Sequence, residues 1–156
     1  MQLVNNVKIE NPDGPQAAAQ AFQTSTNFVN MENYNRCMII LDLDQAGAGT
    51  ATVTLKQGTT SGAGRSLAFS KFWKNEAGGD QLTQVVASTL TTAGAYTGAN
   101  RYVWEVKSED LTTTSGNKLI RCDVASLSNN TAANLEYILY EPRYGSSAYN
   151  LPDGDA

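Results

Sequence analysis

Hydrophobic and polar residues alternate with a period of two along several stretches of the chain. In the run 50–58, Ala51, Val53 and Leu55 fall on one face, and two threonines and a lysine fall on the other. This pattern is typical of an antiparallel strand with one buried face. The same alternation predicts strands over 35–44, 100–108 and 117–127.

Two runs break the simple alternation. In 66–75, Leu67 and Phe69 share a face, but Phe72 falls on the other face beside Trp73, which indicates a bulge or a strand with two different neighbours. The run 135–140 is hydrophobic on both faces. Its second face is covered either by the chain's own segment 1–30 or by another protein, and the sequence leaves both open.

Segments rich in Gly, Asn, Ser and Thr separate these runs, as turns do. With weaker strand patterns at 3–9, 25–29 and 82–90, about eight or nine strands are expected. Helical periodicity is weak: 15–23 could form two turns and 108–111 one. The sequence therefore predicts an all-β protein, an antiparallel β-sandwich of jelly-roll type.

The strands belong to one domain, because neither a linker nor an internal repeat interrupts them. We expect an N-terminal strand or extended arm over 1–34, a β-sandwich core over 35–145 and a loose C-terminal tail over 146–156.

Composition and charge narrow the possible functions. The net charge is −4 and the sequence lacks a cluster of Lys and Arg, so we do not expect nucleic-acid binding. A run long enough to cross a bilayer is also missing, and the start of the chain lacks the pattern of a secretion signal, so we expect neither membrane insertion nor export by the general route. Cys37 and Cys122 each lie in an apolar run and are expected to be buried and reduced; whether they pair is left open.

The chain has no histidine, which removes the commonest general base and metal ligand. The segment 42–47 begins like a calcium loop but lacks later ligands, and 61–66 resembles a phosphate-binding loop only faintly. Five carboxylates that could be catalytic are better explained as solvated strand or loop residues: Glu105, Glu109, Asp110, Asp123 and Glu136. We expect no enzymatic activity, no metal and no cofactor.

Aromatic and apolar residues at positions expected to be exposed favour a protein–protein interface instead. Seven residues are candidates for it: Phe72, Trp73, Ile138, Tyr140, Arg143, Tyr144 and Tyr149. An alternative use of exposed aromatics is a flat carbohydrate-binding platform, for which Trp73, Tyr96 and Tyr102 are the candidates.

Five segments together carry a resemblance that spans roughly residues 26–145: NFVNMENYNRCMIILDL, TVTLKQGTTSGAG, FSKFWKN, YVWEVKSEDL and YILYEPRY. In their order they resemble small virion proteins of tailed bacteriophages that are encoded near the major capsid gene. The resemblance implies a β-sandwich or jelly-roll protein of the phage head. Such proteins often act as capsid decoration (cement) proteins, commonly as homotrimers.

The resemblance thus implies a structural protein that is made in the host cytoplasm and binds the major capsid protein at the capsid surface of the virion. It does not fix the position in the particle, and a protein of the neck or tail is the alternative. A carbohydrate-binding module is a second alternative.

Overall fold

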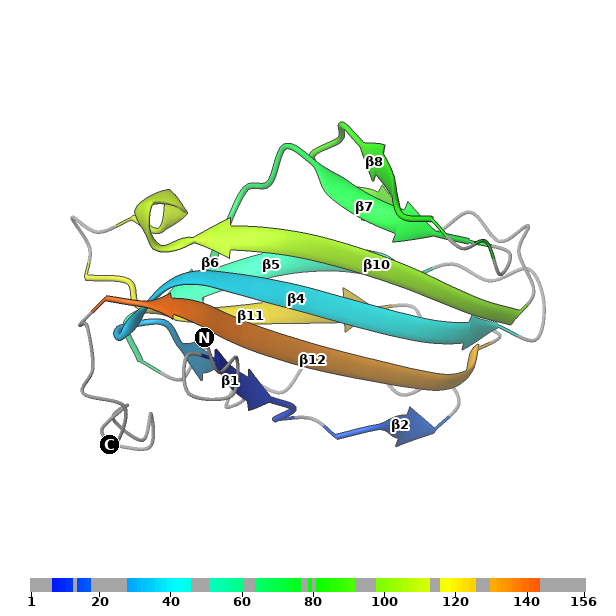
Figure 1. Ribbon diagram of the computed structural model, residues 1–156, viewed down its shortest axis with the longest axis horizontal. Helices are drawn as coiled ribbons and strands as arrows, with labels where there is room; N and C mark the ends of the chain where they lie inside the picture. The colour runs from blue at the N-terminus through cyan, green and yellow to red at the C-terminus, as the bar shows by residue number, and fades with distance from the viewer. Residues whose placement is uncertain are drawn as a thin grey trace.

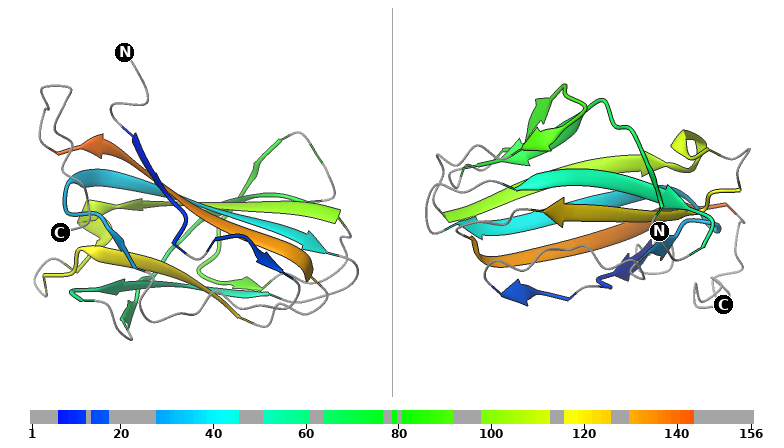
Figure 2. Two further views of the ribbon diagram at one scale, coloured as in Figure 1. Left: turned by 90° about the horizontal axis from the view of Figure 1, so that it is seen from below. Right: turned by 180° about the vertical axis from the view of Figure 1, so that it is seen from behind.

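The computed structural model describes residues 7–12, 14–17, 28–45, 51–60, 64–76, 79, 81–91, 98–112, 116–125 and 130–143. These residues form two antiparallel sheets packed face to face, which confirms the predicted all-β sandwich. In Figure 1 the long strands of the larger sheet lie in front of those of the smaller sheet, and Figure 2 shows the two layers from below and from behind.

The larger sheet has seven strands in the order β1-β12-β4-β10-β7-β8, and β2 also pairs with β12. Their bounds are β1 Val7–Glu10, β2 Gln16–Ala17, β4 Tyr34–Gln45, β7 Phe72–Asn75, β8 Thr83–Val85, β10 Gly98–Lys107 and β12 Asn130–Pro142.

The smaller sheet has five strands in the order β3-β11-β5-β6, with β9 also paired to β5. Their bounds are β3 Val29–Asn30, β5 Thr52–Gly58, β6 Arg65–Ser66, β9 Leu90–Thr91 and β11 Leu119–Ala125. The long strands β4, β5, β10, β11 and β12 alternate between the two sheets along the chain. Four strands of only two residues bring the described total to twelve, above the eight or nine expected.

The core lies between the sheets and follows the predicted alternation. Leu135, Tyr137 and Leu139 of β12 are fully buried, whereas Ile138 and Tyr140 between and beyond them point to the other side of the sheet. Both cysteines are fully buried thiols, as expected. The Tyr137 hydroxyl oxygen accepts a hydrogen bond from the backbone N–H of Cys122 at 2.8 Å, which links the two sheets through the core.

A buried glutamine supports the chain that follows the single turn of 3-10 helix at Ser108–Asp110. The Gln57 side chain accepts hydrogen bonds from the Thr112 N–H at 2.8 Å and from the Asn117 amide at 3.3 Å. Its own amide donates to the Thr112 hydroxyl at 3.1 Å. Because Gln57 is only 6% exposed, these bonds replace water that the groups would otherwise bind.

The run 66–75 is not one strand. The chain leaves the smaller sheet after β6 and enters the larger sheet at β7, so the alternation restarts between them. Phe72 consequently points into the core, where it is 3% exposed and its ring centroid lies 5.9 Å from that of Trp104. Its prediction as an exposed interface residue was therefore wrong.

The strands described in the N-terminal segment 1–34 belong to the two sheets. β1 and β2 pair with the edge of β12, so they widen the larger sheet rather than cover its outer face. The two helical turns considered for 15–23 are contradicted at Gln16–Ala17, which form β2, and the rest of that run lies outside the described residues. The single turn considered for 108–111 is confirmed.

Candidate functional site

The outer face of the larger sheet carries a continuous band of apolar side chains. One cross-strand row joins Ile9 of β1, Ile138 of β12 and Met38 of β4. The next row joins Ile40 of β4, Val103 of β10 and Trp73 of β7. Residues directly opposite each other on antiparallel strands share a face, so the six side chains stand on the same side of the sheet. We call these six residues the outer band.

Five of the six residues of the outer band are accessible to solvent. Ile9 is 66% exposed, Met38, Ile40, Ile138 and Trp73 are half-buried, and Val103, at 7% exposed, is buried between its neighbours on this face. Figure 1 looks onto this face: no described element lies in front of β12, β4 and β10, while β5 and β11 lie behind them. Contiguous apolar surface of this kind typically marks an interaction site.

A hydrogen-bonded polar cluster borders the outer band on one side. The Glu105 carboxylate accepts hydrogen bonds from the Tyr140 hydroxyl and from the Arg36 guanidinium, both at 2.6 Å. The same guanidinium donates to Glu141 at 3.0 Å. Neighbouring strands supply these four side chains, because Tyr140, Arg36 and Lys107 form the cross-strand row next to Ile138, Met38 and Glu105.

The hydrogen bonds within this cluster shift the pKa values of Glu105 and Tyr140. Hydrogen bonds from Tyr140 and then from Arg36 stabilise the charged carboxylate, so the pKa of Glu105 lies below its usual value. Partial burial and the adjacent Glu105 carboxylate raise the pKa of Tyr140 to about 12. At neutral pH the cluster therefore consists of a charged Arg36–Glu105 pair and a neutral tyrosine that donates its proton.

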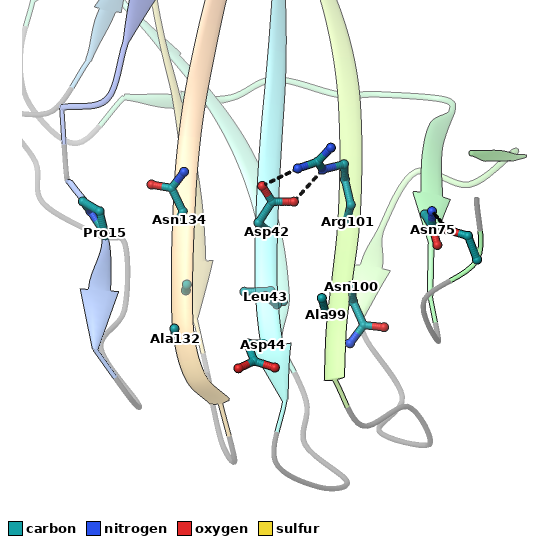
Figure 3. Close-up of a pocket in the computed structure, with 12 residues that line it drawn as sticks. Pro15, Asp42, Leu43, Asp44, Asn75, Ala99, Asn100, Arg101, Ala132 and Asn134 are labelled. Carbon is teal, nitrogen blue, oxygen red and sulfur yellow. Dashed lines mark hydrogen bonds and ion pairs between the residues drawn. The ribbon is translucent and has the colours of Figure 1, made fainter. Parts of the chain in front are cut away.

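The opposite side of the outer band is also polar. Asp42 of β4 accepts two hydrogen bonds from Arg101 of β10, at 2.6 and 2.9 Å. Figure 3 shows this pair beside a shallow cavity of about 410 Å³ that Asp44, Asn134 and Asn75 also line. Because Arg101 already neutralises Asp42, the cavity presents paired polar groups. Within the ranges that the structure describes, no three potential metal ligands lie together.

The outer face of the smaller sheet is built differently. Arg121 of β11 belongs to this face, yet it is only 6% exposed, because the Phe28 ring lies 4.7 Å from its guanidinium carbon. The guanidinium also donates to Asp123. A charged, partly covered face of this kind is a weaker candidate for protein binding than the outer band.

The structure brings three of the predicted interface residues together and separates the others. Trp73 and Ile138 belong to the outer band and Tyr140 to its polar border. Arg143 is exposed and is hydrogen-bonded to the start of β4. Its backbone N–H donates to the Asn33 carbonyl oxygen at 2.9 Å, and its guanidinium donates to the Tyr34 carbonyl oxygen at 3.2 Å. Tyr144 and Tyr149 lie outside the described residues.

The structure contradicts the aromatic platform considered for carbohydrate binding. Tyr102 is 1% exposed and points into the core, where its hydroxyl donates to Glu76 at 2.8 Å. Trp73 pairs with Val103 and so lies on the opposite side of the sheet from Tyr102. Tyr96 lies outside the described residues.

The carboxylates weighed for catalysis each have a hydrogen-bond or charge partner. Besides Glu105, Asp123 accepts from Arg121, Glu109 from Lys107, Asp110 from the Lys107 backbone N–H and Glu136 from Asn134. They are spread over both sheets and the 3-10 turn. Glu105 and Asp110 both line a cavity of about 230 Å³, but the other three carboxylates do not line it. No helix of the described residues has the length and hydrophobicity needed to cross a membrane.

Sequence reasoning missed four members of the outer band: Ile9, Met38, Ile40 and Val103. The signal was present in β4, where Met38 and Ile40 alternate with fully buried residues, so that both faces of the strand are apolar. Only the register shows that this second face meets Ile138 on one side and Val103 on the other.

Comparison with known proteins yields a likeness of fold. No protein-family model matches the sequence, and no curated protein matches it. Among solved structures, the chain is similar to the crystal structure of the SPBc2 prophage-derived protein YomS, with a TM-score of 0.50. The match covers 87% of this chain and 94% of YomS at 7% sequence identity, so it shows that the two share a β-sandwich architecture.

Proposed function

We propose that this protein is a non-catalytic structural component of a tailed-phage virion that binds the major capsid protein and stabilises the capsid shell, as a decoration protein does. The outer band would be the surface that meets the shell. After synthesis in the host cytoplasm, the protein would reside on the capsid surface of the virion.

The observation that carries this proposal is the outer band itself. Six apolar side chains from five strands lie together on one face between two polar borders, and five of them are accessible to solvent. An apolar centre with a polar rim is the usual anatomy of a protein–protein interface. A rigid sheet presents the surface at little cost in conformational entropy, which favours binding.

The phage context rests on two independent likenesses. The segments quoted from residues 26–145 resemble small virion proteins of tailed phages, and the fold is similar to that of a prophage-derived protein.

The test is a sedimentation experiment with mature capsids that lack this protein. The bound protein is compared with the major capsid protein after saturation. We expect a ratio of the same order as the capsid protein, which a lattice position requires. A trace ratio would place the protein at a single vertex, as a neck or tail component, and an absence of binding would refute a capsid role.

Two variants test whether the outer band is the contact. Met38→Lys places a charge in the centre of the band, and Thr54→Lys places one on the outer face of the smaller sheet at a site that is also half-buried. We expect Met38→Lys to abolish shell binding and Thr54→Lys to leave it unchanged, with both variants folded by circular dichroism. Equal binding of both variants would exclude the outer band as the contact.

A further inference from the structure

The two edges of the larger sheet differ in how they are protected. At one edge, β1 carries Lys8 and Glu10, which form an ion pair at 2.7 Å, and Pro12 and Pro15 follow it. Charged residues and prolines are the usual means by which edge strands avoid pairing with other chains. The other edge is β8, and among the described strands it pairs with β7 alone.

β8 lacks this protection. The segment 81–91 contains neither a charged residue nor a proline. Leu82 and Val86, which flank the strand, are 48% and 80% exposed. In Figure 1, β8 forms the upper edge of the sheet, and no described strand lies beyond it. An exposed, uncharged edge with apolar flanks is a template for the addition of another strand.

We propose that β8 pairs with β8 of a second copy of this chain, antiparallel and about a two-fold axis at Gln84. This register places Leu82 opposite Val86 of the second copy, Thr83 opposite Val85, and Gln84 opposite itself. Each exposed apolar side chain then meets another apolar side chain, and the two larger sheets join into one.

Two features favour a second copy over an unrelated strand. A two-fold axis sets identical residues against each other at its centre, which is unfavourable for a charged side chain. Gln84 carries both a donor and an acceptor on its amide, so two copies can hydrogen-bond to each other. The uncharged segment 81–91 likewise brings no like charges together in this pairing.

The joined sheet would carry two outer bands on one continuous surface. In each copy, Trp73 pairs with Gln84, so the outer band reaches as far as β7, next to the proposed junction. The self-association stands apart from shell binding, since either can occur without the other. It also differs from the homotrimer that the sequence resemblance implies.

A charge-swap experiment tests the pairing. Gln84→Glu and Gln84→Lys each place like charges opposite one another, and sedimentation equilibrium measures the dimer dissociation constant. We expect each variant alone to raise this constant by up to about fivefold, and an equimolar mixture of the two to restore it, because opposite charges then face each other. Ile9→Lys, at the other edge of the same sheet, is the matched control and should leave the dimer unchanged.

A cross-link fixes the register independently of affinity. Gln84→Cys should form a disulfide-linked dimer under mild oxidation, because residues directly opposite on antiparallel strands bring their Cβ atoms near disulfide distance. Leu82→Cys alone should not, since its partner in this register is Val86. A monomer at all concentrations, or an oligomer that is insensitive to every change at Gln84, would overturn the proposal.

Discussion

Replacement of Gly64 by alanine tests how the outer face of the smaller sheet is closed. Gly64 directly precedes β6 and has a φ of +59°, in the left-handed region. A Cβ atom there would lie 2.8 Å from the Phe28 ring and 3.1 Å from the Gln57 carbonyl oxygen. Glycine therefore allows Phe28 to approach β5 closely and to cover Arg121.

The cost of Gly64→Ala has two parts that a second glycine separates. Gly14 has a similar φ of +64°, but a Cβ there would meet nothing within 4 Å. Gly14→Ala should therefore cost only the left-handed conformation, roughly 1–2 kcal/mol of unfolding free energy. Gly64→Ala adds the clash with Phe28, for which overpacking typically costs roughly 1–3 kcal/mol more.

Urea unfolding followed by tryptophan fluorescence measures both variants. We expect a lower midpoint for Gly64→Ala than for Gly14→Ala, with unchanged slopes. In a Phe28→Ala background, the effect of Gly64→Ala should fall toward that of Gly14→Ala, because the ring no longer clashes. Equal costs for the two glycines, or the same cost of Gly64→Ala with and without Phe28, would refute this reasoning.

Three other predictions concern single side chains. Gln57→Leu removes the acceptor of the Thr112 N–H and of the buried Asn117 amide and should lower the unfolding free energy by about 1–3 kcal/mol, measured in urea against Thr54→Val as a near-neutral control. The pKa of Tyr140, raised to about 12, lies above its unfolded value, so its contribution to stability is present below about pH 10 and lost as the pH rises toward 12. Tyr140→Phe should flatten that alkaline loss in thermal melts, and an unchanged profile would contradict the assignment. Glu141 has a φ of +55°, and Glu141→Gly and Glu141→Val both lose its hydrogen bond from Arg36. Glu141→Gly should unfold at a higher midpoint than Glu141→Val, because glycine adopts this φ without strain; equal midpoints would show that the backbone is not strained there.

The long strands were predictable because their alternation is enforced by burial on one face. The predicted runs at 35–44 and 100–108 match β4 and β10 to within two residues, and their alternate residues fill the core. The strands of two residues could not be predicted individually from the sequence, because two residues are too few to show a periodic pattern. They exist through pairing with longer neighbours, as β6 and β9 do beside β5.

Phe72 shows why the interface could only be predicted in part. Counted from Leu67, its position falls on the exposed face, but the chain changes sheets between β6 and β7 and the count no longer applies. Most residues of the outer band, in contrast, were missed as interface candidates. Each of its strands shows apolar residues on the second face, yet their alignment into one surface depends on register, which alternation within a strand does not contain.

The polar borders of the outer band bear on how a partner would bind there. Arg36, Glu105 and Glu141 are paired with one another, and Asp42 is paired with Arg101. A partner that covers the band therefore meets charges in these two borders that are already paired, which lowers the penalty of burying them. Contact with this face would draw its free energy from apolar area, with the paired charges acting as a rim that limits where the partner can sit.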